Sequence, residues 1–131
     1  MQLLNSFFHI QSRSDEGGAP TFDVVLDPAH AIFRAHFPGN PIVPGVCQVQ
    51  MTRELLETVL DEHLALVRAK NIKYLTVMTP TQQTEYSIAF RKITTEGDTH
   101  SITADITAGG VTYTKLSLTF QRVPSTTIKH D

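Results

Sequence analysis

The chain has 131 residues, a formal net charge of −2 at pH 7 and a single cysteine. This length suits one domain with a buried core, and we expect residues 1–131 to form a single domain. The balanced charge argues against a nucleic-acid or anionic-membrane partner, and one cysteine excludes an internal disulfide framework.

The first half of the chain predicts a β-hairpin and one long helix. Residues 3–12 are apolar and aromatic, and the turn-forming stretch RSDEGGAP separates them from residues 21–28, where apolar and polar residues alternate. Residues 46–64 contain no Gly or Pro and repeat apolar residues at spacings of three and four, which is typical of an amphipathic helix. The predicted apolar stripe comprises Val46, Val49, Leu56, Val59 and Leu60.

The second half of the chain predicts strands. The candidate strands are residues 66–80, 84–93, 100–107 and 111–123. Their connections TEGD and AGG are short and contain glycine, so we expect the last strands to form antiparallel hairpins. Residues 124–131 have the composition of a frayed end.

Two strands, one helix and four strands indicate an α+β fold. The simplest two-layer solution is a curved antiparallel sheet wrapped around the helix. One edge of such a sheet stays open, and a second copy of the chain can cover it, so we expect a homodimer. The sequence has no signal-peptide pattern and no stretch of roughly 20 apolar residues, and we expect a cytoplasmic protein.

Three prolines and two glycines follow His36 in the stretch AHFPGNPIVPG. The prolines impose a stiff, non-helical path, and the glycines allow close backbone approach. We expect this stretch to hold the imidazole beside the helix start, where the amides around Val46, Cys47 and Gln48 lack intrahelical partners. A carbonyl bound there would be polarised, and His36 could remove a proton from the neighbouring carbon.

The stretch HFPGNPIVPGV before a long helix resembles the β-hydroxyacyl-(acyl-carrier-protein) dehydratases of fatty-acid synthesis, whose motif runs His-Phe-Pro-x-x-Pro-x-x-Pro-Gly-Val. The matching residues are His36, Phe37, Pro38, Pro41, Pro44, Gly45 and Val46. The resemblance implies a hot-dog fold, in which the sheet wraps around the helix, and a dimer that often assembles into a trimer of dimers. It also implies an acyl carrier protein as partner, and no separate cofactor because the phosphopantetheine arm belongs to the substrate.

The resemblance also implies a role for each motif residue. His36 would be the base, and the amides of Gly45 and Val46 would bind the carbonyl of a (3R)-hydroxyacyl thioester. Phe37 and Pro44 would line the substrate site. The product would be a trans-2-enoyl thioester.

The chain departs from the family at Gln50. The family has a catalytic Glu or Asp fourteen residues after the motif His, contributed across the dimer interface, whereas this chain has an amide there. An amide supplies no proton at a useful pKa, although it can hold a hydroxyl or a water. Of the nearest carboxylates, Glu54 and Glu57, Glu54 shares the face of Gln50, but a solvated helix-surface residue is the favoured interpretation.

Three functional interpretations therefore stay open. The first is a dehydratase in which Gln50 orients the leaving group and His36 or a water delivers the proton. The second is a hot-dog thioesterase, and the third is a non-catalytic subunit that binds an acyl carrier protein or acyl thioester.

The remaining candidates have simpler interpretations. Cys47 is expected to be a small core or tunnel residue rather than a nucleophile. His30 and His36 are too weak a pair to indicate a metal site. Phe33 and Tyr74 are expected to line either an acyl tunnel or the core, because both walls have the same composition.

Overall fold

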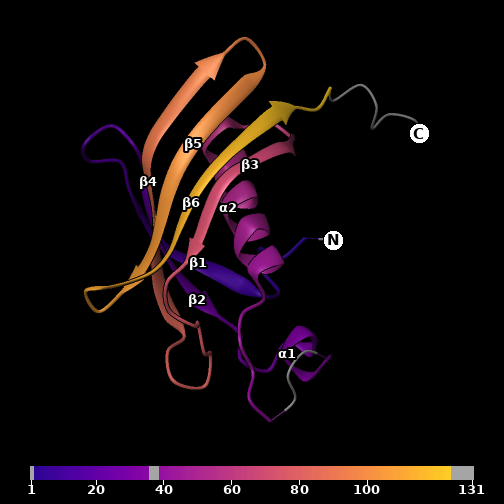
Figure 1. Cartoon of the computed structure of the whole chain (residues 1–131), viewed down its shortest axis with the longest axis vertical. Helices are drawn as coiled ribbons and strands as arrows, with labels where there is room; N and C mark the ends of the chain where they lie inside the picture. Colours follow the sequence, from indigo (N-terminus) through magenta and orange to yellow (C-terminus); the bar gives the residue numbers. More distant parts are fainter. Residues whose placement is uncertain (1, 36–38, 125–131) are drawn as a thin grey trace.

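The computed structural model describes residues 2–35 and 39–124 of the chain. It has the predicted α+β hot-dog architecture, in which a curved six-stranded sheet wraps around one long helix (Figure 1). The elements are β1 (Phe8–Ser14), β2 (Thr21–Leu26), α1 (Ala31–Ala35), α2 (Gly45–Leu60), β3 (Leu64–Tyr74), β4 (Glu85–Glu96), β5 (Thr99–Ala108) and β6 (Val111–Arg122).

The strands follow the order β1-β2-β4-β5-β6-β3, and all neighbouring strands are antiparallel. The predicted hairpins β1–β2, β4–β5 and β5–β6 are confirmed. Strand β3 pairs with β6, so β1 and β3 form the two edges of the sheet. The edge strand β3 therefore has a neighbour on one side only.

The strand periodicity correctly predicted which side chains enter the core. One face of each of four strands points toward α2, as expected when a strand has one buried face. The side chains on these faces are at most 3% exposed: Phe22, Val24, Leu26, Tyr86, Ile88, Phe90, Ile102, Ala104, Ile106, Leu116, Leu118 and Phe120.

The predicted apolar stripe of α2 is wrong in part. Val46 is 74% exposed, and Val49 is only half-buried, whereas Met51 and Leu55 are fully buried. Polar residues also enter the buried surface, which includes Gln48, Thr52 and Glu54. The physical reason is that the sheet and the N-terminal residues cover more of the helix than a single stripe.

Helix α2 ends earlier than predicted. Asp61 adopts a left-handed conformation with a φ of 54°, and its amide donates to the carbonyl of Glu57. Leu64 then begins β3 rather than extending the helix. No helix in the described ranges is long and apolar enough to cross a bilayer.

The N-terminal strand also begins later than predicted. Asn5 has a φ of 72°, and the amides of Phe7 and Phe8 both donate to the carbonyl of Leu3. Residues 3–7 therefore form a turn, and their apolar side chains fill the core instead of alternating along a strand. The short helix α1 was not predicted, and of the expected frayed end only Pro124 lies within the described residues.

Candidate functional site

The backbone amides at the start of α2 differ in the partners they have among the described residues. Pro44 is the N-cap, and its carbonyl accepts from the amides of Cys47 (3.0 Å) and Gln48 (3.2 Å). The expectation that these two amides are unpaired is therefore wrong. Among the described residues, no acceptor pairs with the amides of Gly45 and Val46, which occupy the first two helical positions.

A mostly apolar pocket of about 220 Å³ lies beside this helix start. One wall comes from the segment that enters α2, and the other comes from the end of β3 and the residues after it. Residues lining it include Ile42, Val43, Gly45, Tyr74, Val77 and Met78. The amide of Val43 donates to the carbonyl of Met78 (2.9 Å), which joins the two walls.

Gly45 allows Tyr74 to pack against the helix start. A Cβ at position 45 would lie 2.5 Å from the Tyr74 hydroxyl oxygen, closer than side chains normally approach. Burial raises the pKa of the Tyr74 hydroxyl above its usual value, so this group stays protonated at neutral pH. Tyr74 lines the pocket, while Phe33 packs against Phe7 in the core (ring centroids 5.0 Å apart).

The buried amide side chain of Gln48 is part of the pocket wall. Gln48 is 4% exposed, accepts from the Thr114 hydroxyl (2.5 Å) and donates to the carbonyl of Val43 (3.3 Å). The hydroxyl of Thr52 donates to the backbone carbonyl of Gln48 (2.9 Å). Sequence reasoning missed Gln48, and the only signal is its spacing of four from Thr52 on the helix face that continues to Leu56.

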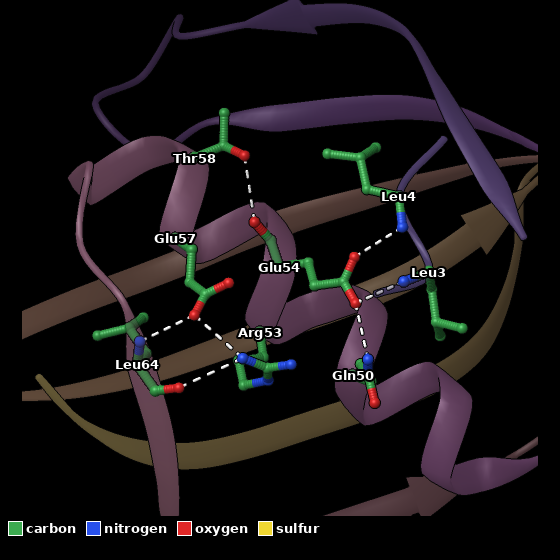
Figure 2. A network of polar contacts seen from close by, with 8 residues as sticks. All are labelled: Leu3, Leu4, Gln50, Arg53, Glu54, Glu57, Thr58 and Leu64. Carbon is green, nitrogen blue, oxygen red and sulfur yellow. Dashed lines mark hydrogen bonds and ion pairs between the residues drawn. The ribbon is translucent and has the colours of Figure 1, made fainter. Parts of the chain in front are cut away.

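Gln50 lies further along α2, next to a buried carboxylate. Its Nε2 donates to Glu54 Oε2 (2.8 Å), and the same carboxylate accepts from the amides of Leu3 (2.8 Å) and Leu4 (2.7 Å) (Figure 2). Glu54 is only 5% exposed, so its interpretation as a solvated surface residue is wrong. The reason is that the N-terminal residues cover this face of the helix.

Glu57 has a different role on the next turn. Its Oε2 accepts from Arg53 Nη1 (3.0 Å) and from the amide of Leu64 (2.8 Å), on another side of the helix from Gln50 (Figure 2). The carboxylate therefore joins the end of α2 to the start of β3.

The predicted site residues are placed only in part. His36, Phe37 and Pro38 lie outside the described residues, whereas Pro44, Gly45 and Val46 lie together at the helix start. The catalytic and binding roles assigned to these positions and to Gln50 remain predictions. Across residues 2–35 and 39–124, no three His, Cys, Asp or Glu side chains form a group that could hold a metal ion.

Comparison with protein families gives one match that spans most of the chain. The sequence profile described as "ApeI-like: ApeI dehydratase" matches residues 11–110. No curated protein sequence matches.

Solved structures share the fold at low sequence identity. The dehydratase heterocomplex ApeI:P from Xenorhabdus doucetiae has 20% identity and a TM-score of 0.62, with coverage of 86% of this chain and 96% of that chain. A mutant thioesterase from Pseudomonas aeruginosa has 17% identity and a TM-score of 0.62, with 89% and 81% coverage. An uncharacterized protein from Erwinia carotovora subsp. atroseptica has 22% identity and a TM-score of 0.55, with 89% and 92% coverage.

The contact between Gly45 and Tyr74 can be tested by a double-mutant cycle. We expect Gly45→Ala to lower the free energy of unfolding by about 1 kcal/mol, because the added methyl forces the Tyr74 ring outward. In a Tyr74→Ala background the same change should be neutral or stabilising by up to about 1 kcal/mol, because alanine favours helix. Urea denaturation measures both values, and equal losses in the two backgrounds would contradict the packing argument.

Cys47 is expected to react slowly with thiol reagents. The side chain is 7% exposed, and burial raises the pKa of its thiol, so less thiolate is present at any given pH. At pH 7.5 an aromatic disulfide reagent should modify the folded protein at least about tenfold more slowly than the urea-unfolded chain. Complete reaction of the folded protein within the mixing time would contradict this expectation.

Proposed function

The chain belongs to the ApeI-like dehydratase family, and we propose that it is a (3R)-hydroxyacyl-[acyl-carrier-protein] dehydratase, which removes water from an acyl thioester to give a trans-2-enoyl thioester. The observation that carries the proposal is that the amides of Gly45 and Val46, beside an apolar pocket, have no acceptor within the part of the chain that the structure describes. They belong to the last two residues of the motif that begins with His36, the proposed base.

The proposed reaction begins at the thioester carbonyl. The amides of Gly45 and Val46 donate to its oxygen, which stabilises negative charge there and acidifies the neighbouring carbon. His36 removes the α-proton and becomes an imidazolium. The bond between the β-carbon and the hydroxyl oxygen then breaks, the imidazolium proton passes to that oxygen, and water leaves while His36 returns to its neutral form.

Gln50, contributed by the partner subunit across the dimer interface, has a positioning role in this proposal. Its side-chain amide forms a hydrogen bond with the leaving hydroxyl group but does not protonate that group. The imidazolium of His36 must therefore supply the proton. The lack of a positioned acid costs about 10²-fold to 10⁴-fold in rate relative to a site with a carboxylic acid at this place. A slow dehydratase is therefore expected.

A thioesterase is the second candidate, favoured by the buried carboxylate of Glu54 beside Gln50. Such a group could act as a base toward a water molecule. However, both of its oxygens already accept backbone amides, and Oε2 also accepts from Gln50. These three donors leave it poorly suited to proton abstraction, so we rank hydrolysis below dehydration.

The proposed partners are an acyl carrier protein and a second copy of the chain. Edge strand β3 exposes Leu66 (42%) and Val67 (53%), and an unpaired apolar edge favours pairing with another strand. We propose an antiparallel β3–β3 homodimer, with a trimer of dimers as the larger assembly. The similar structure from Xenorhabdus doucetiae is a heterocomplex, so a different subunit at this edge is the second possibility.

The activity is tested with 3-hydroxyacyl, 2-enoyl and saturated acyl thioesters of the carrier arm. We expect enoyl formation by the native protein, its loss in His36→Ala and a higher rate in Gln50→Glu, because a carboxylic acid can protonate the leaving oxygen. His9→Ala is the matched control, since His9 is an exposed residue of β1, and it should leave the rate unchanged.

The other products of this assay distinguish the alternatives. Release of free thiol without enoyl formation would establish a thioesterase. Binding of the thioesters with no turnover by either route would establish a non-catalytic subunit and contradict the proposal.

The proposed dimer is tested with charge on the edge strand. Val67→Lys places a cation at the β3 edge, where it should oppose strand pairing and shift the protein toward monomer. Sedimentation equilibrium measures the mass, with Val111→Lys as control because Val111 is comparably exposed (44%) but lies at the β5–β6 turn. A monomeric native protein, or equal dissociation by both variants, would contradict the β3 interface.

A further inference from the structure

Glu54 is a buried charge that the proposed reaction does not use. Its carboxylate is 5% exposed and lies between α2 and the N-terminal turn (Figure 2). Taking a carboxylate out of water is costly unless hydrogen bonds replace its hydration. Three N–H donors do so here, from the backbone of Leu3, the backbone of Leu4 and the side chain of Gln50.

This contact directs the donor end of the Gln50 amide toward Glu54. A glutamine side chain has a donor end and an acceptor end, and a carboxylate oxygen that already accepts a backbone N–H pairs with the donor end. The spacing of four residues places the two side chains one helical turn apart, within direct reach. Figure 2 shows the Gln50 oxygen directed away from Glu54 and from the N-terminal residues.

We propose that Glu54 is a positioning residue, which fixes the Gln50 amide with its carbonyl oxygen toward the reaction site of the partner subunit. Gln50 then acts as a hydrogen-bond acceptor for the O–H of the β-hydroxyl group or of a bound water. The inference rests on the proposed function in that it takes Gln50 to face the substrate. It adds that Gln50 orients the leaving hydroxyl group by accepting a hydrogen bond from the O–H of that group.

The orientation also depends on the N-terminal residues. The amide of Leu3 and Nε2 of Gln50 donate to the same oxygen, Oε2, whereas the amide of Leu4 donates to Oε1. The two backbone donors fix the plane of the carboxylate and thereby the direction from which Gln50 approaches. Leu3 itself is 1% exposed, so the turn that presents these amides is anchored in the core.

The orientation can be measured in the native protein by NMR, without reference to activity. Because Leu3 and Gln50 donate to one oxygen, the backbone amide proton of Leu3 should show an NOE to the side-chain amide protons of Gln50. Those side-chain protons should also exchange slowly with water. If no such NOE is present in the folded protein, the amide faces the other way and the proposal is overturned.

Its consequence for the reaction is measured with two matched variants. Glu54→Gln removes the charge that selects the donor end of Gln50 while keeping the side chain's size. Glu57→Gln removes the same charge one turn along the same helix, where the carboxylate accepts from one backbone amide, rather than two, and from Arg53, on another side of the helix from Gln50. We expect Glu54→Gln to lower kcat of dehydration about 10-fold to 10²-fold, with KM changed less than about twofold, and Glu57→Gln to leave both nearly unchanged.

A third comparison separates positioning from a structural role. In a Gln50→Ala background, Glu54→Gln should cause no further fall in kcat, because the group through which Glu54 acts is absent. Equal falls in both backgrounds, or an equal effect of Glu57→Gln, would overturn the proposal in favour of a general effect on stability. If the native protein shows the NOE but dehydrates no substrate, the proposed function fails while the orientation stands.

Discussion

A helix enclosed by a sheet must satisfy its polar groups inside the protein, and this constraint organises the molecule. The sheet and the N-terminal turn bury Gln48, Thr52 and Glu54 of α2, and a buried polar group without a partner costs about 1–3 kcal/mol. Gln48 is paired with Thr114 on β6, and Thr52 bonds the helix backbone itself. The carboxylate of Glu54 accepts hydrogen bonds from the N-terminal backbone amides and from the side chain of Gln50. The partners of Gln48 and Glu54 include other parts of the chain, whereas the partner of Thr52 lies in the same helix. These contacts hold α2 against β6 and the N-terminal turn.

At the start of α2, two residues lack groups that most residues carry, and this leaves room for a close contact. Pro44 brings no backbone N–H to the cap, and Gly45 brings no Cβ, so Tyr74 at the end of β3 can approach the first turn. The pocket forms where these two segments meet, although they are about thirty residues apart in the sequence. The amides of Gly45 and Val46 lie at this junction. The proposed chemistry is placed here because a carbonyl bound by these amides would lie beside the pocket.

The parts of the fold that the sequence predicted are those with a local, one-sided pattern. Apolar and polar residues alternate along strands such as β6 because one face of the strand packs against the helix. This alternation can be recognised in the sequence alone. The stripe of α2 was misjudged because the helix is covered on several sides, which removes the contrast that a stripe requires. The burial of Glu54 had no local signal, since it depends on Leu3 and Leu4, about fifty positions away. The motif from His36 to Val46 indicated a hot-dog fold by resemblance, whereas only the structure showed which helix amides have no acceptor among the described residues.

An amide at position 50 changes how protons are handled in the proposed reaction. A site with a base and a separate acid can take the α-proton on one group and return a different proton from the other. With Gln50 held as an acceptor by Glu54, one imidazole must do both, so the α-hydrogen and the β-hydroxyl have to lie within reach of the same ring. The proposed reaction then depends on how the substrate is oriented rather than on the acidity of a second catalytic group. A carboxylate that never touches the substrate can meet it, because fixing the acceptor end of Gln50 fixes the direction in which the hydroxyl proton points.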